Sequence, residues 1–163
     1  MKKDLYQKII DYIIENQNKF YRLAYSYTRN QEDALDVVQN SVCKALEHYE
    51  ELKNENAVNT WIYRIVVNES LRTIKENKKH DLFKNSGESE GVYEERRFDV
   101  QDDLYEQINR LDKDTQTIIK LRFYEDLALQ QIADIMEMNL NTVKAKLYRG
   151  LQALKVSMKE DSI

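Results

Sequence analysis

A run of positive charge at helical spacing lies in the last third of this 163-residue chain. Residues 138–158 contain no Asp or Glu, although Asp and Glu outnumber Lys and Arg by 29 to 25 in the whole sequence. Lysine and threonine can hold phosphates, whereas asparagine and arginine can form paired hydrogen bonds with base edges. This concentration of cations and amides, in a chain of formal net charge −4, predicts a surface that binds DNA.

Two helices joined by a tight turn are needed to position these side chains. At about 100° per residue, one narrow stripe of the second helix collects apolar side chains, namely Leu140, Val143, Leu147, Leu151 and Leu154. Asn139 is placed to cap that helix, and Ala133 is small enough to let the two helices cross closely. The opposite face and its flanks carry the candidate DNA contacts, which are Asn141, Thr142, Lys144, Ala145, Lys146 and Arg149. An ordinary helical hairpin with a solvated basic face has the same pattern.

The composition favours an all-α protein with short polar connections, because the chain has no proline, three glycines and 33% charged residues. Its N-terminal segment is expected to form an amphipathic helix, since Asp11 and Glu15 interrupt the apolar positions that a signal peptide needs. No run of 18 apolar residues exists, so no membrane insertion is expected. The single Cys43 excludes an internal disulfide and is expected to be a small core residue. We therefore expect a cytoplasmic protein.

The sequence carries no pattern that indicates catalysis. It lacks a glycine-rich phosphate loop, an HExxH motif and a nucleophile elbow, and its two histidines have no neighbouring ligand set. We therefore expect no enzymatic activity, no metal, no cofactor and no small-molecule substrate.

Three parts follow one another along the chain. Residues 1–77 have the periodicity of three main helices, over residues 5–28, after Asn30, and over residues 60–75. Residues 78–103 are polar and acidic, contain two of the three glycines, and are expected to be a flexible linker. Residues 104–163 have the periodicity of four helices, of which the last two form the helix-turn-helix. We expect two small helical domains, whose relative arrangement the linker leaves open.

Two further polar surfaces are predicted in the first part. Asn30 can cap the second helix, whose core face is Ala34, Val37, Val38, Ser41, Val42 and Ala45. A polar face remains on this helix, and it includes Asp36, Gln39 and Asn40. On the third helix, residues at steps of three or four form one continuous stripe, namely Trp61, Arg64, Asn68, Arg72 and Lys75. Trp61 is also compatible with a core position.

These motifs resemble those of bacterial extracytoplasmic-function sigma factors, the smallest members of the sigma-70 class, and within them the sigma-V group. The segment LDKDTQTIIKLRFYEDLALQQIADIMEMNLNTVKAKLYRGLQALK aligns without gaps to the C-terminal pattern of that family. The segment DALDVVQNSVCKA resembles its D-A-E-D-L-V-Q-E-x-F motif, and TWIYRIVVNESLRTIK resembles its W-L-x-x-I-A-x-N motif. Both motifs stand in the expected order and at the expected separation.

The resemblance implies a function for each predicted surface. Asp36, Gln39 and Asn40 correspond to the contact with core RNA polymerase. The −10 promoter element would be bound by the loop of residues 49–59 and by the third-helix stripe, Trp61, Arg64, Asn68, Arg72 and Lys75. The −35 element would be bound by the recognition helix. Catalysis would belong to the polymerase, and the family implies a membrane-anchored anti-sigma protein as a further partner, with cell-envelope stress as the signal.

Four positions depart from the family pattern. Asp112 replaces a proline, and Glu137 replaces the glycine of the helix-turn-helix turn, which costs roughly 1 kcal/mol if that residue is left-handed. Asn40 replaces an acidic residue, and Arg72 replaces an aspartate. The first two substitutions concern stability, whereas the last two concern polymerase affinity or promoter preference.

Two alternatives to the sigma factor function remain. A stand-alone helix-turn-helix regulator would dimerise, bind paired half-sites and need no polymerase. The two N-terminal motifs argue against it, because a repressor has no use for them. A protein-interaction module that has lost DNA binding is the second alternative. Binding and transcription with core polymerase separate both from a sigma factor.

Overall fold

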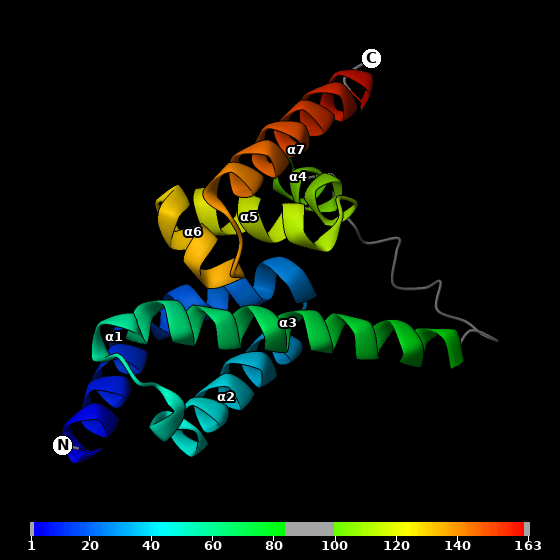
Figure 1. Ribbon diagram of the computed structural model, residues 1–163. Helices are drawn as coiled ribbons and strands as arrows, with labels where there is room; N and C mark the ends of the chain where they lie inside the picture. The colour runs from blue at the N-terminus through cyan, green and yellow to red at the C-terminus, as the bar shows by residue number, and fades with distance from the viewer. Residues whose placement is uncertain (1, 84–99, 162–163) are drawn as a thin grey trace.

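The computed structural model describes the backbone of residues 2–83 and 100–161 and the side chains of residues 4–82 and 103–157. The described residues are helical and form two layers (Figure 1). The first layer holds α1 (Lys2–Thr28), α2 (Gln31–Glu47) and α3 (Val58–Phe83), with the short 3-10 helices η1 (Tyr49–Glu51) and η2 (Glu55–Ala57) between α2 and α3. The second layer holds α4 (Val100–Asn109), α5 (Lys113–Phe123), α6 (Leu129–Met136) and α7 (Leu140–Asp161).

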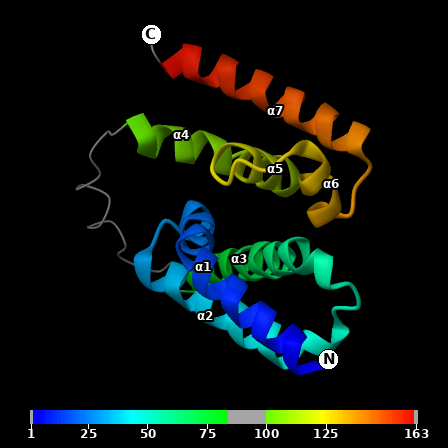
Figure 2. The same ribbon diagram turned by 90° about the vertical axis from the view of Figure 1, so that its left-hand side faces the viewer.

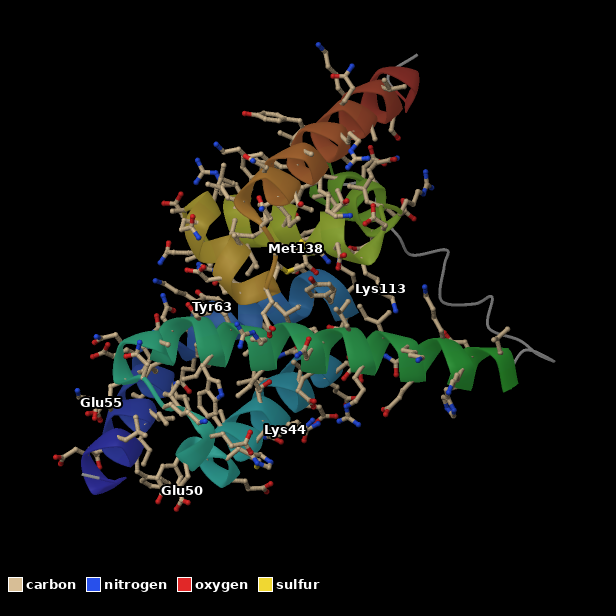
Figure 3. The ribbon with its side chains drawn as sticks, in the orientation of Figure 1. Lys44, Glu50, Glu55, Tyr63, Lys113 and Met138 are labelled. Atoms are coloured by element: carbon tan, nitrogen blue, oxygen red, sulfur yellow. The ribbon has the colours of Figure 1, made fainter. Side chains whose placement is uncertain are left out.

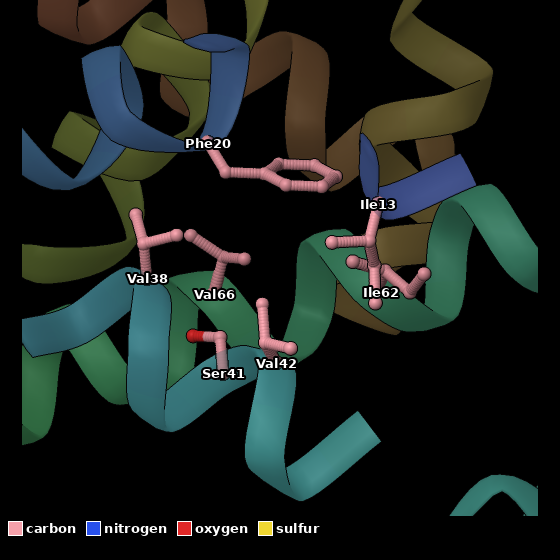
Figure 4. A pocket seen from close by; sticks show the side chains of 7 residues that line it. All are labelled: Ile13, Phe20, Val38, Ser41, Val42, Ile62 and Val66. Carbon is pink, nitrogen blue, oxygen red and sulfur yellow. The ribbon is translucent and has the colours of Figure 1, made fainter. Parts of the chain in front are cut away.

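The first layer is a three-helix bundle around one apolar core. Asn30 caps α2 as predicted, because its side chain accepts a hydrogen bond of 3.1 Å from the backbone N–H of Asp33. A cavity of about 10 Å³ remains where the three helices meet. Figure 4 shows the side chains that line it, which are Ile13, Phe20, Val38, Ser41, Val42, Ile62 and Val66. The small size and apolar lining of this cavity fit a packed core rather than a ligand site.

In the second layer, α5, α6 and α7 pack against one another (Figure 2). The predicted stripe of α7 faces the interior of this layer, with Val143, Leu147 and Leu154 buried and Leu140 and Leu151 half-buried. On α6, Ile132, Ala133 and Ile135 are buried. The all-α fold with two small helical domains, as expected from the sequence, is therefore confirmed.

Some local expectations differ from the structure. Helix α3 continues to Phe83, two turns beyond its expected end, and α4 begins at Val100, before the expected start of the second domain. The prediction that Cys43 is a core residue was wrong, because its side chain is exposed. Ser41 and Ala45 are buried on the core face of α2. Cys43 lies two residues from each, about 200° around the helix, and so faces solvent.

The turn between α6 and α7 has the backbone geometry that the family glycine suggested. Glu137 is left-handed, with φ 55° and ψ 47°, and its backbone N–H bonds to the carbonyl of Asp134. A residue with a Cβ pays about 1–2 kcal/mol in this conformation. Asn139 then caps α7, since its side chain accepts a hydrogen bond of 2.7 Å from the N–H of Asn141. The turn is therefore held by backbone bonds and a cap despite an unfavourable residue.

Gly150 sets the distance between α5 and α7. A Cβ placed on Gly150 would lie 2.5 Å from the Thr115 side-chain methyl and 3.0 Å from the Ile119 side chain. At a solvent-exposed position within a helix, Gly→Ala stabilises the helix by about 1 kcal/mol. Here we predict that Gly150→Ala lowers the free energy of unfolding by about 1–3 kcal/mol, because the added methyl group overpacks the interface. Chemical denaturation measures this change.

The matched test removes the methyl group that the new side chain would meet. Thr115→Ser combined with Gly150→Ala should recover part of the lost stability, because the contact at 2.5 Å involves Thr115. If Gly150→Ala stabilised the parent protein as it does an exposed helix, the close packing of α5 and α7 described above would be contradicted.

Candidate nucleic-acid interface

Helix α7 presents the predicted recognition face to solvent. Among the candidate −35 contacts, the side chains that are exposed are Asn141, Thr142, Lys144, Ala145 and Arg149. The side chain of Arg149 lies along its own helix, with Nε 3.4 Å from the carbonyl of Ala145. This face is free of other helices because Val143, Leu147 and Gly150 turn the opposite side of α7 into the domain core. The exposed cations and amides are thus available to a nucleic acid.

Lys146 differs from the other members of this set because it is half-buried. It lines a groove between the start of α5 and α7, together with Asp112, Thr115 and Arg149. The backbone N–H of Thr115 donates to Asp112 at 3.1 Å. Hydrogen bonding to Thr115, first with its side chain and then with this backbone N–H, outweighs the effect of burial and holds the pKa of Asp112 below its usual range, and the charge of Lys146 adds a smaller effect in the same direction. Lys146 therefore faces the N-terminal cap of α5 as well as solvent.

Tyr148 is an exposed residue of the recognition helix that the sequence interpretation missed. Its side chain is 65% exposed, which is high for an aromatic residue. The signal was present in the sequence, because Tyr148 lies outside the apolar stripe and one turn after Lys144. An aromatic ring in this place can contact a thymine methyl group or a sugar, so Tyr148 joins the candidate interface.

The predicted stripe of α3 also lies on one face, with Asn68 and Lys75 exposed. Arg72 is exposed but engaged, because it donates to Glu69 at 3.0 Å and to Glu76 at 3.1 Å. Glu69 is buried and also accepts a bond from Lys44 of α2. Burial opposes ionisation of Glu69, but the bonds from Arg72 and Lys44 outweigh it and lower the pKa. Arg72 is thus fixed in place by a buried carboxylate.

The N-terminal half of the same stripe meets the second domain. Arg64 donates to the backbone carbonyl of Ile135 at 3.1 Å and to that of Asp134 at 2.7 Å. Its Nε also lies 3.2 Å from the carboxylate of Glu137. These acceptors are at the C-terminal end of α6, where carbonyls lack helical partners and a cation is favoured. Trp61, one turn earlier, is half-buried.

A second contact between the domains surrounds Lys120 of α5, which is completely buried. Its ammonium group donates three hydrogen bonds: to the backbone carbonyl of Ser26 at 3.0 Å, to Asn109 at 2.8 Å and to Gln116 at 3.0 Å. The nitrogen also lies 3.5 Å from the centre of the Tyr27 ring. Burial, with a smaller contribution from Arg29, lowers the pKa of Lys120 well below its usual value.

A third contact is formed by Glu125, in the turn after α5. Its side chain has no exposed surface, and one carboxylate oxygen accepts a bond of 2.9 Å from the hydroxyl of Tyr63 on α3, labelled in Figure 3. The other oxygen lies 4.0 Å from Arg22 and has no hydrogen-bond partner. Burial raises the pKa of Glu125, although the bond from Tyr63 and the charge of Arg22 act in the opposite direction.

The predicted polymerase surface lies on α2, away from the contact between the domains. Asp36, Gln39 and Asn40 are all exposed, as a face not used in packing should be. Leu35, next to Asp36, is 46% exposed and was missed. Its position outside the predicted core stripe of α2 was the available signal. A single exposed apolar residue is normal at a protein surface, so Leu35 is noted only for its place beside Asp36.

Two negative findings concern only the described residues. No group of three or more His, Cys, Asp or Glu side chains is arranged to hold a metal ion in that part of the chain. Within the same residues, no helix has the length and apolar content needed to cross a membrane.

The fold is that of a two-domain helical protein with a C-terminal helix-turn-helix, an architecture found in DNA-binding proteins of transcription. The model of sigma-70 region 2 matches residues 12–80, and the model of sigma-70 region 4 matches residues 101–154. The RNA polymerase sigma factor SigV of Bacillus subtilis is 38% identical over 160 residues, which cover 94% of this chain and 93% of SigV. The chain therefore belongs to the extracytoplasmic-function sigma factors of the sigma-70 family.

A further relative and two solved structures are also similar to this chain. The ECF RNA polymerase sigma factor SigW of B. subtilis is 24% identical, covering 97% of this chain and 91% of SigW. The sigma factor RpoE of Bartonella quintana, solved with the anti-sigma factor NepR, superposes with a TM-score of 0.70 and 19% identity over 91% of this chain and 95% of RpoE. CnrH, solved with the cytosolic domain of CnrY, gives a TM-score of 0.71 at 15% identity, over 94% and 88% of the two chains.

The hydrogen bond between Tyr63 and Glu125 can be tested by removing one hydroxyl group. Tyr63→Phe would leave the buried carboxylate without its hydrogen-bond donor, so we predict a loss of about 1–3 kcal/mol in the packing of the two domains. Dyes on the exposed Cys43 and on a Gln152→Cys variant would report the distance between the layers, which should increase. Tyr148→Phe is the matched control, because that ring is exposed. An unchanged distance in Tyr63→Phe would contradict the role of this bond.

The raised pKa of Glu125 predicts a pH dependence of stability. The folded protein holds the Glu125 proton more tightly than the unfolded chain, whose value is near 4.5. The free energy of unfolding should therefore fall as pH rises above that value through the folded pKa. Glu125→Gln keeps an acceptor for Tyr63 but cannot ionise, so its stability relative to the parent should increase with pH. A difference that is constant from pH 4 to 8 would contradict the burial of an ionised carboxylate.

Proposed function

We propose that this protein binds core RNA polymerase and directs promoter-specific initiation, with residues 1–77 contacting the polymerase and the −10 element and residues 104–163 contacting the −35 element. The observation that carries this proposal is the presence of two exposed polar faces, on α3 and α7, in a chain whose two domains match sigma-70 regions 2 and 4. The intervening residues 78–103 join the two binding domains.

The −35 contact is assigned to α7, with Asn141, Lys144, Lys146 and Arg149 as its main residues and Thr142, Ala145 and Tyr148 beside them. Support comes from the exposure of this face and from the lack of acidic residues in the segment. Arg149 is suited to paired hydrogen bonds with a guanine edge, whereas Lys144 is suited to phosphate.

The −10 contact is assigned to the outward stripe of α3, Trp61, Arg64, Asn68, Arg72 and Lys75, and to the preceding loop. Asn68 can bond or stack with an extruded base, and the cations can follow phosphates. Arg64 donates to two carbonyls of α6 in this structure. Contact of Arg64 with DNA therefore requires α6 to move away from α3.

The remaining partners follow from family membership and from the exposed face of α2. Asp36, Gln39 and Asn40, with Leu35, are assigned to the clamp of core polymerase. RpoE was solved with the anti-sigma factor NepR, and CnrH was solved with the cytosolic domain of CnrY. By analogy we assign to this chain an anti-sigma protein anchored in the membrane, a place in the cytoplasm, and genes of the cell-envelope stress response. The chain does no chemistry itself.

Transcription with purified components tests the proposal. Core polymerase with this protein should start run-off transcription at one site on the promoter of its own operon, and core polymerase alone should not. Arg149→Ala should weaken promoter binding by about 1–3 kcal/mol if Arg149 contacts a base. Arg110→Ala, which removes an exposed arginine between α4 and α5, is the matched control.

Two outcomes would contradict the assignment. Unchanged promoter binding by Arg149→Ala would remove Arg149 from the −35 contact. Absence of both transcription and co-migration with core polymerase would exclude a sigma factor and favour the stand-alone regulator, whose palindromic sites should then bind the isolated protein as a dimer.

A further inference from the structure

Helix α1 carries side chains that contact both ends of the loop assigned to the −10 element. At the start of the loop, the ring of Tyr6 meets the ring of Tyr49 edge to face, with 5.1 Å between their centres. At its other end, the loop passes through η2 into α3, which begins at Val58. Residues 53–56, between these ends, are exposed. The part of the loop that is open to a ligand is therefore anchored on a helix to which no DNA contact has been assigned.

Two polar contacts join α1 to the last residues of this loop at matching spacing. The ammonium group of Lys8 donates a hydrogen bond of 2.8 Å to the carboxylate of Glu55, labelled in Figure 3. One turn later on α1, the hydroxyl of Tyr12 donates to the side-chain oxygen of Asn59. The partners are 47 residues apart in both contacts, so successive turns of α1 meet the loop at points four residues apart. Two points of attachment fix the orientation of the segment between them, whereas one would leave it free to rotate.

An exposed amide side chain lies between these two contacts. Asn56 is exposed, and its backbone N–H donates a hydrogen bond of 3.0 Å to the side chain of Asn54, which caps η2. Two residues later, Val58 is buried in the core of the first domain. The amide group of Asn56 can form paired hydrogen bonds with the edge of an extruded base. The direction of that group depends on a backbone that the two contacts with α1 hold in place.

The two contacts differ in how strongly they hold the loop. The side chains of Lys8 and Glu55 are 58% and 48% exposed, and exposed ion pairs contribute little to stability and are screened by salt. Tyr12 and Asn59 are half-buried. Burial raises the pKa of the Tyr12 hydroxyl, which therefore remains a hydrogen-bond donor at neutral pH. Because the ion pair adds little to the stability of the fold, its main effect is on the position of the loop.

We propose that Lys8 and Tyr12 of α1 are positioning residues for the −10 contact, because they hold residues 54–59 in the conformation that meets the promoter strand. This inference rests on the proposed function, since it uses the assignment of the loop to the −10 element. It extends that function to α1, to which the assigned DNA contacts do not belong. Lys8 acts through Glu55 and Tyr12 acts through Asn59, so neither side chain touches a base or a phosphate.

Discrimination between two single strands tests this positioning. Holoenzyme would be titrated with a labelled non-template oligonucleotide that spans the −10 element of the promoter found by run-off transcription, and with a scrambled strand of equal length. The ratio of the two affinities cancels the phosphate contribution that both strands share. We expect this ratio to fall roughly two- to five-fold in Lys8→Gln and in Glu55→Gln, the range that an exposed ion pair allows. Tyr12→Phe, which removes a hydrogen bond, should lower the ratio about three- to ten-fold.

Three further variants control for effects other than positioning. Lys8→Gln combined with Glu55→Gln should lose no more discrimination than either single variant, because both changes break the same contact. Gln7→Ala is the matched control for α1, since Gln7 donates to Asp11 of the same helix at 2.9 Å. Tyr21→Phe removes a hydroxyl group from another half-buried tyrosine of α1. Both control variants should discriminate between the strands as the parent does.

Three results would overturn the proposal. Parental discrimination in Lys8→Gln, Glu55→Gln and Tyr12→Phe would show that the loop does not need these contacts. Weaker binding of both strands by Lys8→Gln, together with tighter binding by Glu55→Gln, would show that Lys8 contacts phosphate directly. An equal loss of affinity for both strands, accompanied by lost helicity, would show that the contacts serve folding alone.

Failure of this inference can be told apart from failure of the proposed function. If the parent holoenzyme binds both strands equally well, the assignment of the −10 contact fails, and the positioning inference fails with it. If the parent discriminates between the strands and the Lys8, Glu55 and Tyr12 variants do so equally well, the −10 contact stands and the positioning by α1 alone is wrong. Co-migration with core polymerase should be unchanged in every variant, because none of the changes is on the assigned polymerase face of α2.

Discussion

Lys120 brings an ammonium group into an interior shared by the two domains. Its three donors are used by the Ser26 carbonyl, by Asn109 and by Gln116, and its charge lies over the Tyr27 ring. Ser26 and Tyr27 belong to α1, so this single side chain connects the domains through neutral acceptors. Neutral acceptors satisfy the hydrogen bonds of a buried ammonium group but do not repay all of its lost hydration. This contact therefore fixes how the domains pack, but it stabilises their packing less than a contact with a fully compensated charge would.

Glu125 and Arg64 are also charged groups of the contact between the domains that lack a full set of charged or hydrogen-bonding partners. One oxygen of the buried Glu125 carboxylate lacks a hydrogen-bond partner, and Arg64 binds carbonyl groups at the end of α6 rather than a buried carboxylate. Contacts between domains that contain many polar groups commonly allow relative motion. Each of these groups regains water when the domains separate. Polar and charged side chains thus form much of the contact between the two helical domains.

The sequence predicted those features that depend on neighbours along the chain. The faces of α2, α3 and α7 and the caps at Asn30 and Asn139 follow from helical periodicity and local backbone preference, whereas the left-handed turn at Glu137 was expected only from the resemblance to the family. The contacts that Lys120, Glu125 and Arg64 make with the other domain could not be predicted, because those partners lie 62 to 103 residues away along the chain and the linker composition sets no arrangement of the domains. A lysine in a helix is ordinarily expected at the surface, so nothing in the sequence marked Lys120 as buried.

One part of the outward face of α3 contacts α6, and the other part is open to solvent. Its N-terminal half, at Arg64, is covered by α6, whereas Asn68, Lys75 and Lys79 are open to solvent. In the proposed contact with DNA, long-range electrostatic attraction acts on the exposed cations of α3, and this first step requires no movement of α6. Contact with Arg64 can follow only once its bonds to the α6 carbonyls are broken. Because those carbonyls are at a helix end, water can replace the guanidinium there at small cost. The C-terminal end of α6 therefore determines that Arg64 is the last residue of the α3 stripe to become accessible.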